Sequence, residues 1–406
     1  MNLVIPFFIR FLHWSVVGIL TTVMTLLILS KGLGLAEVGL VVASFSAVVI
    51  LLEFPSGVLS DRLGRRTVYL LSIGVAIAAS ATLIFAGGFW SVTLGFCLFG
   101  VARALSSGSI ESDFIDRHIE CHGQAALPGL MTVMGVGETV GLATGALLGG
   151  LMPLWWTTLM PGAGRYEGNL WLQIAILLVL GVLTLVTSPP GRPAATGAGD
   201  GGLRAHLRET FAVVGKTRIL ALILGGAALW GIALNAVELF WQPQLRTILG
   251  GESQTWVFGL VNSGYFVAAL VGTLVAGALL SRAGLPPVAL VIAGRLMTGG
   301  LLAVLAFQMQ LGPFAIVYLL MFLGNGIGSL PESTLYNAHV PSERRASLLS
   351  LLSLVVQLGG VIGSLAWSRL VGPVGIAGLG LAAGIILAVS GALFLLVRPA
   401  PAGRTE

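Results

Sequence analysis

The stretch EFPSGVLSDRLGRR, residues 53–66, carries five charged side chains and directly follows fifteen residues, 38–52, that carry none. A long apolar run that ends in a charged turn is typical of a helix that crosses a lipid bilayer and leaves it at the turn. The stretch therefore predicts a membrane-spanning helix over about residues 38–59, with its charges at a membrane surface.

The composition of the whole chain extends this prediction. Its 406 residues are 56% hydrophobic and 9% charged, whereas an ordinary soluble domain is about 25% charged. The first apolar segment has no basic flank or cleavage site, so we expect a retained span and not a signal peptide. Because one crossing needs about 20 mostly apolar residues, we expect an all-α membrane protein with twelve spans, near residues 11–29, 38–59, 68–88, 90–110, 127–151, 170–187, 219–241, 256–280, 286–308, 312–331, 347–367 and 374–397.

The basic residues predict how the chain is oriented. With both termini in the cytoplasm, fourteen of the 21 Lys and Arg residues fall on the inner side, four on the outer side and three in or near spans. Positive side chains are enriched in cytoplasmic loops, so the formal charge of +5 needs no nucleic-acid partner. We expect a multi-pass protein of the cytoplasmic membrane with both termini inside, and the compact loops and preference for Arg over Lys favour a bacterial source.

A polar interruption near the middle divides the chain into two halves of six spans. The predicted units are an N-terminal bundle over 1–188, a cytoplasmic linker over 189–217 and a C-terminal bundle over 218–406. Within the linker, LRAHLRETFAVVG has apolar residues at helical spacing. It predicts a helix on the cytoplasmic membrane surface, either as a simple linker or as a lipid sensor.

The two halves are related in sequence. GVLSDRLG at 57–64 recurs as GALLSRAG at 277–284, and SGSIESDFID at 107–116 aligns with GSLPESTLYN at 328–337, which pairs Glu111 with Glu332. A weaker match pairs two glycines of each half, Gly137 and Gly141 with Gly359 and Gly363. Three matches in order at nearly one offset predict a six-helix unit used twice in the same orientation, with a site between the halves near mid-membrane.

The segment GVLSDRLGRR, 57–66, resembles the signature loop between helices 2 and 3 of the major facilitator superfamily, G-x-L-A-D-R-x-G-R-R/K, with Ser60 in place of the common alanine. Together with the spans and the repeat, this resemblance covers essentially the whole chain. It implies twelve helices in two parallel six-helix repeats, and transport by rocking one half against the other.

The resemblance also implies a latch at the inner surface. In it, Asp61 faces the start of helix 11 near Ala346, and Arg65 pairs with Asp116. Gly57 is expected to allow close helix approach and Gly64 to form a turn. The alternative is that the arginines only fix the topology. Ser281 replaces the acid in the second-half copy, so we expect an asymmetric latch, and the predicted gating residues are Glu53, Gly57, Asp61, Arg62, Gly64, Arg65, Arg66 and Asp116.

Ionisable groups inside spans are costly and are functional candidates. In the superfamily, helices 1, 4, 7 and 10 line the central cavity, and by resemblance this favours His13, Arg103, Glu111, Glu238 and Glu332, while Arg295 is a weaker candidate. Arg103 resembles the arginine of the superfamily's helix 4 motif, and the alternative for it is an ion pair with Glu53 or Glu111.

The most informative candidates lie on helix 7. Asn235 and Glu238 are three residues apart and so share one helix face. A carboxyl group in a cavity of low dielectric can load and release a proton as the cavity alternates between the two sides. Glu238 is therefore predicted to carry a proton, and the alternative is a structural hydrogen bond to a neighbouring helix.

Helix 5 carries glycines four apart, at 137, 141, 145 and 149, which predicts close helix packing. The part Gly141, Gly145, Gly149 and Gly150 resembles the superfamily's antiporter motif, G-x-x-x-G-P-x-x-G-G, with Ala146 in place of the proline. Glu138 on the same helix is predicted to carry a proton or to form a contact with helix 8.

Several classes of function are excluded or disfavoured by what the sequence contains. Two isolated cysteines give neither a disulfide framework nor metal-ligand spacing, and no phosphate loop or nucleophile and base pair stands out. We therefore predict a monomeric transporter without cofactor or metal, whose partners are the lipid bilayer, protons and a small molecule. We expect it to export an amphipathic drug or metabolite in exchange for protons. The alternatives are a proton symporter or facilitator that imports a nutrient, and a membrane sensor.

Overall fold

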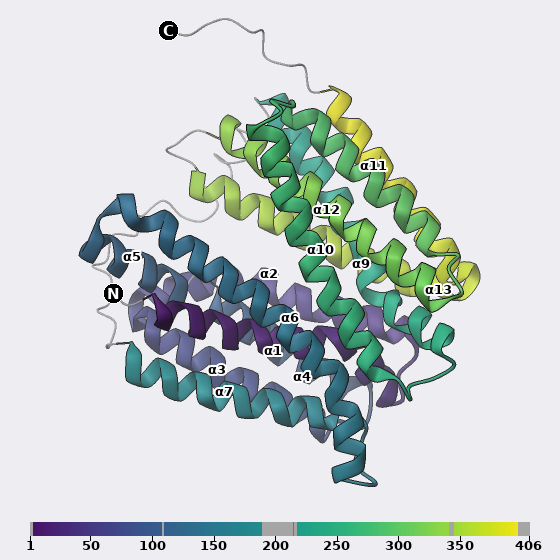
Figure 1. Cartoon of the computed structure of the whole chain (residues 1–406). Helices are drawn as coiled ribbons and strands as arrows, with labels where there is room; N and C mark the ends of the chain where they lie inside the picture. The colour runs from purple at the N-terminus through teal and green to yellow at the C-terminus, as the bar shows by residue number, and fades with distance from the viewer. Residues whose placement is uncertain (1–2, 108, 189–213, 215–216, 341–344, 397–406) are drawn as a thin grey trace, which may run out of the picture.

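The computed structural model describes the chain except residues 1–2, 108, 189–213, 215–216, 341–344 and 397–406 (Figure 1). The described residues form helices and no strand. The predicted linker and its amphipathic helix lie almost wholly outside this part of the chain. The first half contains α1 Val4–Ser30, α2 Leu35–Leu63, α3 Arg65–Ile84, α4 Phe89–Ser106, α5 Ile110–His122, η1 Gln124–Ala126, α6 Leu127–Leu159 and α7 Glu167–Thr187.

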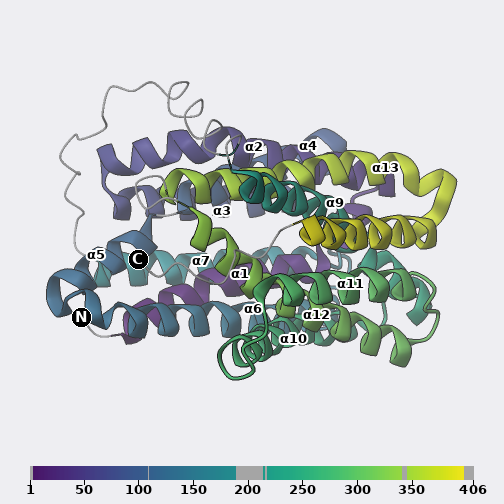
Figure 2. The same ribbon diagram turned by 90° about the horizontal axis from the view of Figure 1, so that it is seen from above.

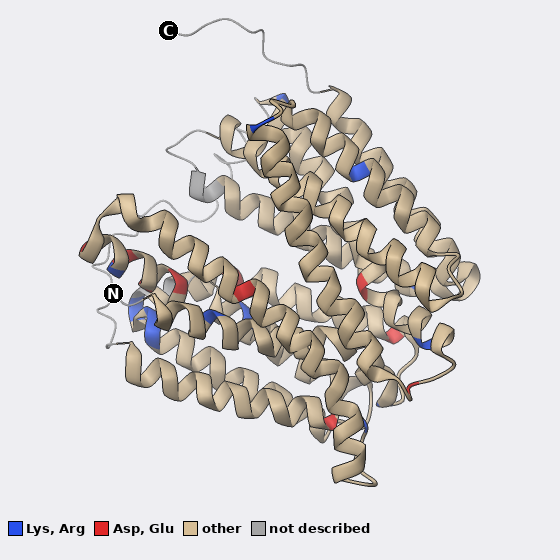
Figure 3. Ribbon diagram, viewed as in Figure 1, with Lys and Arg blue, Asp and Glu red and all other residues tan. Residues whose placement is uncertain are grey.

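The second half repeats this arrangement of long apolar helices. It contains α9 Arg218–Leu249, α10 Thr255–Ser281, α11 Pro287–Leu305, α12 Leu311–His339, α13 Arg345–Ala392 and η3 Leu393–Leu396. Charged side chains are sparse along both sets of helices (Figure 3), as a helix inside a bilayer requires.

The described residues include eleven helices that are long and apolar enough to cross a membrane. The last of these, Leu348–Leu396, has 49 residues, which is more than two crossings need. At Gly375 the backbone leaves the helix with φ of +67°, and the chain turns back on itself (Figure 2). It therefore provides two antiparallel crossings, and the predicted all-α fold of twelve membrane helices is confirmed.

One predicted helix boundary was wrong. We expected Glu111 on the same helix as Arg103, but α4 ends at Ser106 and the separate α5 begins at Ile110. The hydroxyls of Ser106 and Ser109 donate to the carbonyls of Arg103 and Ser106, and such local bonds compete with the helical backbone pattern. Glu111 consequently lies in the first turn of α5.

The helices form two bundles that are joined along two pairs of helices. α1 packs on α6 and α7 in the first bundle, and α9 packs on α13 in the second. Between the bundles, α6 contacts α10 and α2 contacts α13. Figure 1 shows the bundles meeting at one end and separating at the other, where the N-terminus lies. These are called the closed end and the open end below.

The repeat seen in the sequence is also present in the helix contacts. A Cβ added to Gly137 would lie 2.8 Å from the carbonyl oxygen of Phe7 in α1, and one added to Gly363 would lie 2.8 Å from that of Ile232 in α9. The glycine face of α6 thus packs on α1 as the glycine face of the first part of α13 packs on α9. Close backbone approach of this kind requires residues without a side chain.

The glycines of the charged loop have different roles. Gly64 has φ of +85° and its repeat partner Gly284 has φ of +62°, a region that only glycine adopts readily. The predicted turn at Gly64 is therefore present. The close helix approach expected at Gly57 is absent among the described residues, because a Cβ there would meet none of their atoms within 4 Å. The bundles separate toward that end, so no described helix approaches α2 closely at Gly57 in this conformation.

Candidate central cavity

A cavity of about 600 Å³ lies between the two bundles, within the range of about 300–1,000 Å³ that is typical of small-molecule sites. Its wall combines residues of α1, α2, α3, α4, α6 and α7 with residues of α9, α10, α12 and α13. Aromatic side chains form part of this wall, among them Trp14, Phe45, Trp230, Trp241 and Tyr265.

Two ionisable side chains of opposite charge face this cavity. Glu238 of α9 and Arg103 of α4 both line it and are both exposed. Among the described residues, neither has a hydrogen bond or an ion pair through its side chain. The guanidinium carbon of Arg103 lies 5.5 Å from the centre of the Trp14 ring, a cation–π distance. The alternative for Arg103, an ion pair with Glu53 or Glu111, is therefore absent among the described residues, and so is the structural hydrogen bond that was the alternative for Glu238.

Asn235 and His13 also line the cavity. The side-chain oxygen of Asn235 accepts a hydrogen bond of 3.1 Å from Ser364 in α13. The ring of His13 is 3.2 Å from the hydroxyl of Tyr69 in α3, through its Nδ1 atom. Both residues lie where the sequence placed them, and both are held by a neighbouring helix.

Glu111 does not reach the cavity. It belongs to a cluster in which Arg10 of α1 binds two carboxylates, Glu111 at 3.1 Å and Glu138 of α6 at a shorter distance. The side chains of the two acids are about one-third exposed. Glu138 therefore contacts α1. Of its two predicted roles, a contact with helix 8 is not seen among the described residues, and proton carriage stays a prediction. Sequence reasoning missed Arg10, although a basic residue inside a span predicts an acidic partner.

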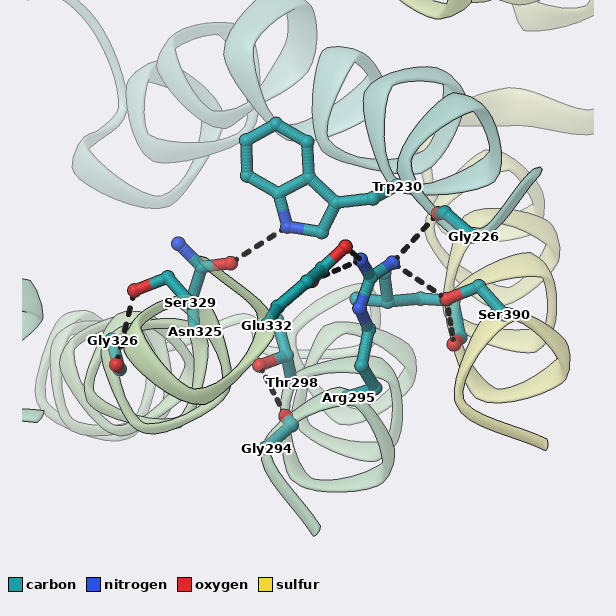
Figure 4. A network of polar contacts seen from close by, with 11 residues as sticks. Gly226, Trp230, Gly294, Arg295, Thr298, Asn325, Gly326, Ser329, Glu332 and Ser390 are labelled. Atoms are coloured by element: carbon teal, nitrogen blue, oxygen red, sulfur yellow. Dashed lines mark hydrogen bonds and ion pairs between the residues drawn. The ribbon is translucent and has the colours of Figure 1, made fainter. Parts of the chain in front are cut away.

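Glu332 was also expected in the central cavity and lies outside it. Its carboxylate accepts two hydrogen bonds, of 2.7 and 2.5 Å, from Arg295 of α11. The same guanidinium donates to Gly226 O and Ser390 Oγ (Figure 4). Glu332 and Arg295 line a smaller cavity of about 190 Å³, and Trp230 borders both cavities. A buried arginine needs such a complete set of acceptors. The Glu332 carboxylate is therefore bound to Arg295 and does not face the central cavity.

Polar contacts between the bundles close one end of the cavity. The side-chain oxygen of Gln242 accepts a hydrogen bond of 2.9 Å from the backbone N–H of Thr25. The amide nitrogen of Gln242 donates a hydrogen bond of 2.8 Å to Thr21 O. The amide of Asn262 donates 2.9 Å to the hydroxyl of Thr22. These contacts join α9 and α10 to α1, and they were not predicted because neither partner carries a charge that marks it in the sequence.

A charged cluster covers the same closed end. Glu252, in the loop before α10, accepts a hydrogen bond of 2.8 Å from the hydroxyl of Tyr166 in the other half. Its carboxylate also forms an ion pair of 3.0 Å with Arg246. Arg165 donates 3.1 Å to the Glu252 carbonyl. Burial, together with the neighbouring Glu252 carboxylate, raises the pKa of the Tyr166 hydroxyl, so this hydroxyl stays protonated and remains a donor.

The comparison with known families follows from this architecture. The sequence model of the Major Facilitator Superfamily matches residues 6–338. The chain belongs to this superfamily. Members of the superfamily are membrane transporters, so the chain is a transporter and not an enzyme. A comparison with curated protein sequences gives no match.

Solved structures of superfamily transporters have the same fold. A bacterial homologue of the human lysosomal transporter Spinster, inward-facing and unoccupied, matches with a TM-score of 0.80, 16% identity and 98% of both chains covered. The nucleoside transporter NupG gives a TM-score of 0.78 and 16% identity over 98% of this chain and 99% of its own. A POT family transporter in complex with a thioalcohol-conjugated peptide gives a TM-score of 0.72 and 13% identity, over 97% of this chain and 95% of its own. These low identities establish the fold alone.

The latch residues of the superfamily loop are only partly visible. Arg65 pairs with Asp116 of α5 at 2.5 Å, the contact that the resemblance implied. Arg66 donates 2.8 Å to Leu185 O, and Arg62 is exposed. The side chain of Asp61 and residues 341–344 lie outside the described part, so the predicted contact of Asp61 with helix 11 stays a prediction.

Glu53 was expected in the latch and connects the two bundles. Its carboxylate accepts a hydrogen bond of 3.0 Å from Gln357 of α13. Gln357 also lines the central cavity. Glu53 therefore lies deeper than the charged loop, at the joint between α2 and α13.

The glycines that resemble the antiporter motif serve two contacts. A Cβ at Gly141, Gly145 or Gly149 would overlap a backbone carbonyl of α1, whereas one at Gly150 would lie 2.6 Å from Gly259 of α10. Three of the four glycines thus join α6 to its own bundle, and the fourth lies between the bundles. No group of three or more metal-ligating side chains is found among the described residues.

Proposed function

We propose that the chain is a secondary active transporter that exports a small amphipathic organic compound across the cytoplasmic membrane in exchange for protons. The observation that carries the proposal is the Glu238 carboxyl group, which faces the central cavity without a partner among the described residues. Such a group can bind a proton or a ligand cation, and either one displaces the other.

The proposed cycle uses the two ends of the molecule. If the termini are cytoplasmic, the open end admits a compound from the cytoplasm while the contacts of Gln242, Asn262 and Glu252 keep the closed end shut. Rocking the bundles breaks these contacts and opens the cavity to the outside. There a proton replaces the compound on Glu238, and the protonated carboxyl group returns with the cavity to the cytoplasm.

A second candidate is import by symport with protons. Arg103 keeps its charge and is free to hold an anion, while Glu238 carries the proton inward together with it. The nucleoside transporter NupG has this fold, so a nucleoside is among the compounds that a transporter of this fold can carry.

The direction of accumulation separates export from import. Inside-out membrane vesicles that contain the full chain are given a pH gradient with the vesicle interior acidic. A panel of amphipathic aromatic compounds, which includes anions, cations and zwitterions, is then added outside. Export by antiport predicts that a compound accumulates inside these vesicles and that a protonophore abolishes the accumulation. Accumulation only in right-side-out vesicles, driven by an outside-acid gradient, would contradict export and support symport.

A further inference from the structure

Within the described part of the chain, the central cavity has a cation on one wall and an anion on the opposing bundle, and neither side chain makes an ion pair or a hydrogen bond. Arg103 belongs to the first bundle and Glu238 to the second. Both line the cavity and both are exposed there. The two charges therefore face a common space from the two bodies that move during transport.

Two other arginines inside described spans are already paired with carboxylates. Arg10 binds Glu111 and Glu138, and Arg295 binds Glu332. Glu53, which also belongs to a span, accepts a hydrogen bond from the uncharged amide of Gln357, and its charge acts on Arg103 without a direct contact. Charges inside a membrane are costly without a partner. Two charges in one cavity that bond to no described side chain therefore indicate that a ligand bonds to them during the transport cycle.

Water can solvate both groups while the cavity is open, but not when the cavity closes around a ligand. An arginine does not lose its proton in a protein, so an occluded Arg103 needs an anion. An occluded Glu238 needs either a cation or a proton. A ligand with only one charge would leave the other group unmatched or force it to change its protonation.

The surroundings of each charge agree with this division. On the second bundle, Tyr318 lies between Trp241 and Phe322, with ring centres 5.5 and 4.9 Å away, and Tyr265 is 3.9 Å from Phe322. All four rings line the cavity together with Glu238, and aromatic faces attract cations. On the first bundle, the Trp14 ring is already contacted by Arg10 as well as by Arg103, each guanidinium carbon being 5.5 Å from its centre. That wall favours an anion.

We infer that the substrate is an amphipathic zwitterion, whose anionic group is bound by Arg103 and whose cationic group is bound by Glu238 beside the aromatic rings of the second bundle. This inference rests on the proposed function and specifies its substrate class. The ligand bridges the two bundles, so both charges are matched when the cavity closes. In the exchange step a proton on Glu238 takes the place of the ligand's cationic group.

Binding of a matched series of probes tests this inference. The zwitterion 4′-(aminomethyl)biphenyl-4-carboxylic acid is compared with its methyl ester, which has only the cation, and with its N-acetyl derivative, which has only the anion. Affinity for the purified full chain at pH 7 is measured by calorimetry. We expect the zwitterion to bind about tenfold more tightly than either relative, as the loss of one charged contact implies.

Two variants identify which residue binds which group. Glu238→Gln should lower the affinity for the zwitterion to that for the N-acetyl anion and leave the anion's affinity unchanged. Arg103→Gln should lower it to that for the methyl ester and leave the ester's affinity unchanged. Glu120→Gln and Arg369→Gln, which change exposed residues outside the cavity, are the matched controls and should bind all three compounds as the native chain does.

Three results would overturn the inference: equal affinity of the native chain for the zwitterion and one singly charged relative, an equal loss for all three compounds in either variant, or no binding of any of them. Because binding is measured without a pH gradient, its outcome is separate from that of proton-coupled export. Zwitterion selectivity without proton-driven accumulation would support the substrate class and contradict the proposed function.

Discussion

The two halves of the molecule share a backbone and differ in where their charges lie. Glu111 and Glu332 are repeat partners, yet Glu111 binds Arg10 of the first helix in its half and Glu332 binds Arg295 of the third helix in its half. The first arginine serves two acids that are about one-third exposed, and the second serves one acid and is 4% exposed. The comparison teaches that both copies of the unit have the same helix packing, while their ion pairs join different helices.

The cavity charges show the same division. With the offset of the second match, the position equivalent to Glu238 in the first half is Val17, and the position equivalent to Arg103 in the second half is Gly324. Each half thus contributes one charge that the other lacks. An asymmetric cavity of this kind can hold an unsymmetrical ligand in one orientation.

Replacing Arg295 or Arg10 singly should give the largest difference between the halves in the free energy of unfolding. Arg295→Leu leaves the Glu332 carboxylate without its partner in a buried site, and we expect a loss of about 3–5 kcal/mol in the free energy of unfolding. Arg10→Leu should cost less, because its acids are more exposed. Thermal and denaturant unfolding in a mild detergent measure both. The double variant Arg295→Leu with Glu332→Leu should recover most of the loss, and failure to recover would show that the pair is not the cause.

Alanine substitutions in the glycine faces should affect both halves alike. A Cβ at Gly141 would overlap the carbonyl of Phe11, and one at Gly359 would overlap that of Ala228. We expect each change to cost about 1–3 kcal/mol, since the helices must move apart. Gly57→Ala is the control, because a Cβ there meets no atom of the residues that the structure describes within 4 Å. A clear difference between the two halves in unfolding experiments would contradict the shared packing.

Alanine substitutions in the turns after the second helix of each half should lower the free energy of unfolding alike, and by less than those in the glycine faces. Gly64 and Gly284 both have positive φ, and an alanine in that conformation costs about 1 kcal/mol. Gly64→Ala and Gly284→Ala should therefore lower the free energy of unfolding by similar amounts. If Gly64→Ala abolishes transport and Gly284→Ala does not, the first loop has the additional gating role that its charges suggest.

The smallest effect is expected at the closed end. Glu252→Gln weakens the pairing with Arg246 and the hydrogen bond from Tyr166, and contacts of this exposure contribute about 0.5 kcal/mol. The population of molecules opened at that end should rise about twofold. Electron-spin distance measurements between labels at positions 159 and 253 would detect it. Glu167→Gln, which alters a pair with Lys31 inside one bundle, should leave the distances unchanged.

Much of the fold could be predicted from the sequence because it depends on local patterns. Apolar run length marks each span, glycines four apart mark a contact face, and Gly64 marks a turn. The break between α4 and α5 was missed because apolar length does not register the competition of Ser106 and Ser109 with the helix backbone.

The site was predicted less well because pairing depends on three-dimensional position. Glu238, Asn235, His13 and Arg103 line the cavity as expected. Glu111 and Glu332 do not, since each is bound by an arginine from another helix. Knowing which helix faces a cavity does not say whether a given carboxylate is already matched by a neighbour, and that distinction separates the candidate ligand groups from the structural ones.

The most direct test of the account is proton movement driven by a compound in liposomes that contain the purified chain and a pH-sensitive dye. We predict that addition of a transported compound moves protons in the opposite direction, and that Glu238→Gln abolishes this movement while exchange of labelled for unlabelled compound continues, with Glu120→Gln behaving as the native chain. Undiminished proton movement in Glu238→Gln would contradict the central claim that Glu238 carries the exchanged proton.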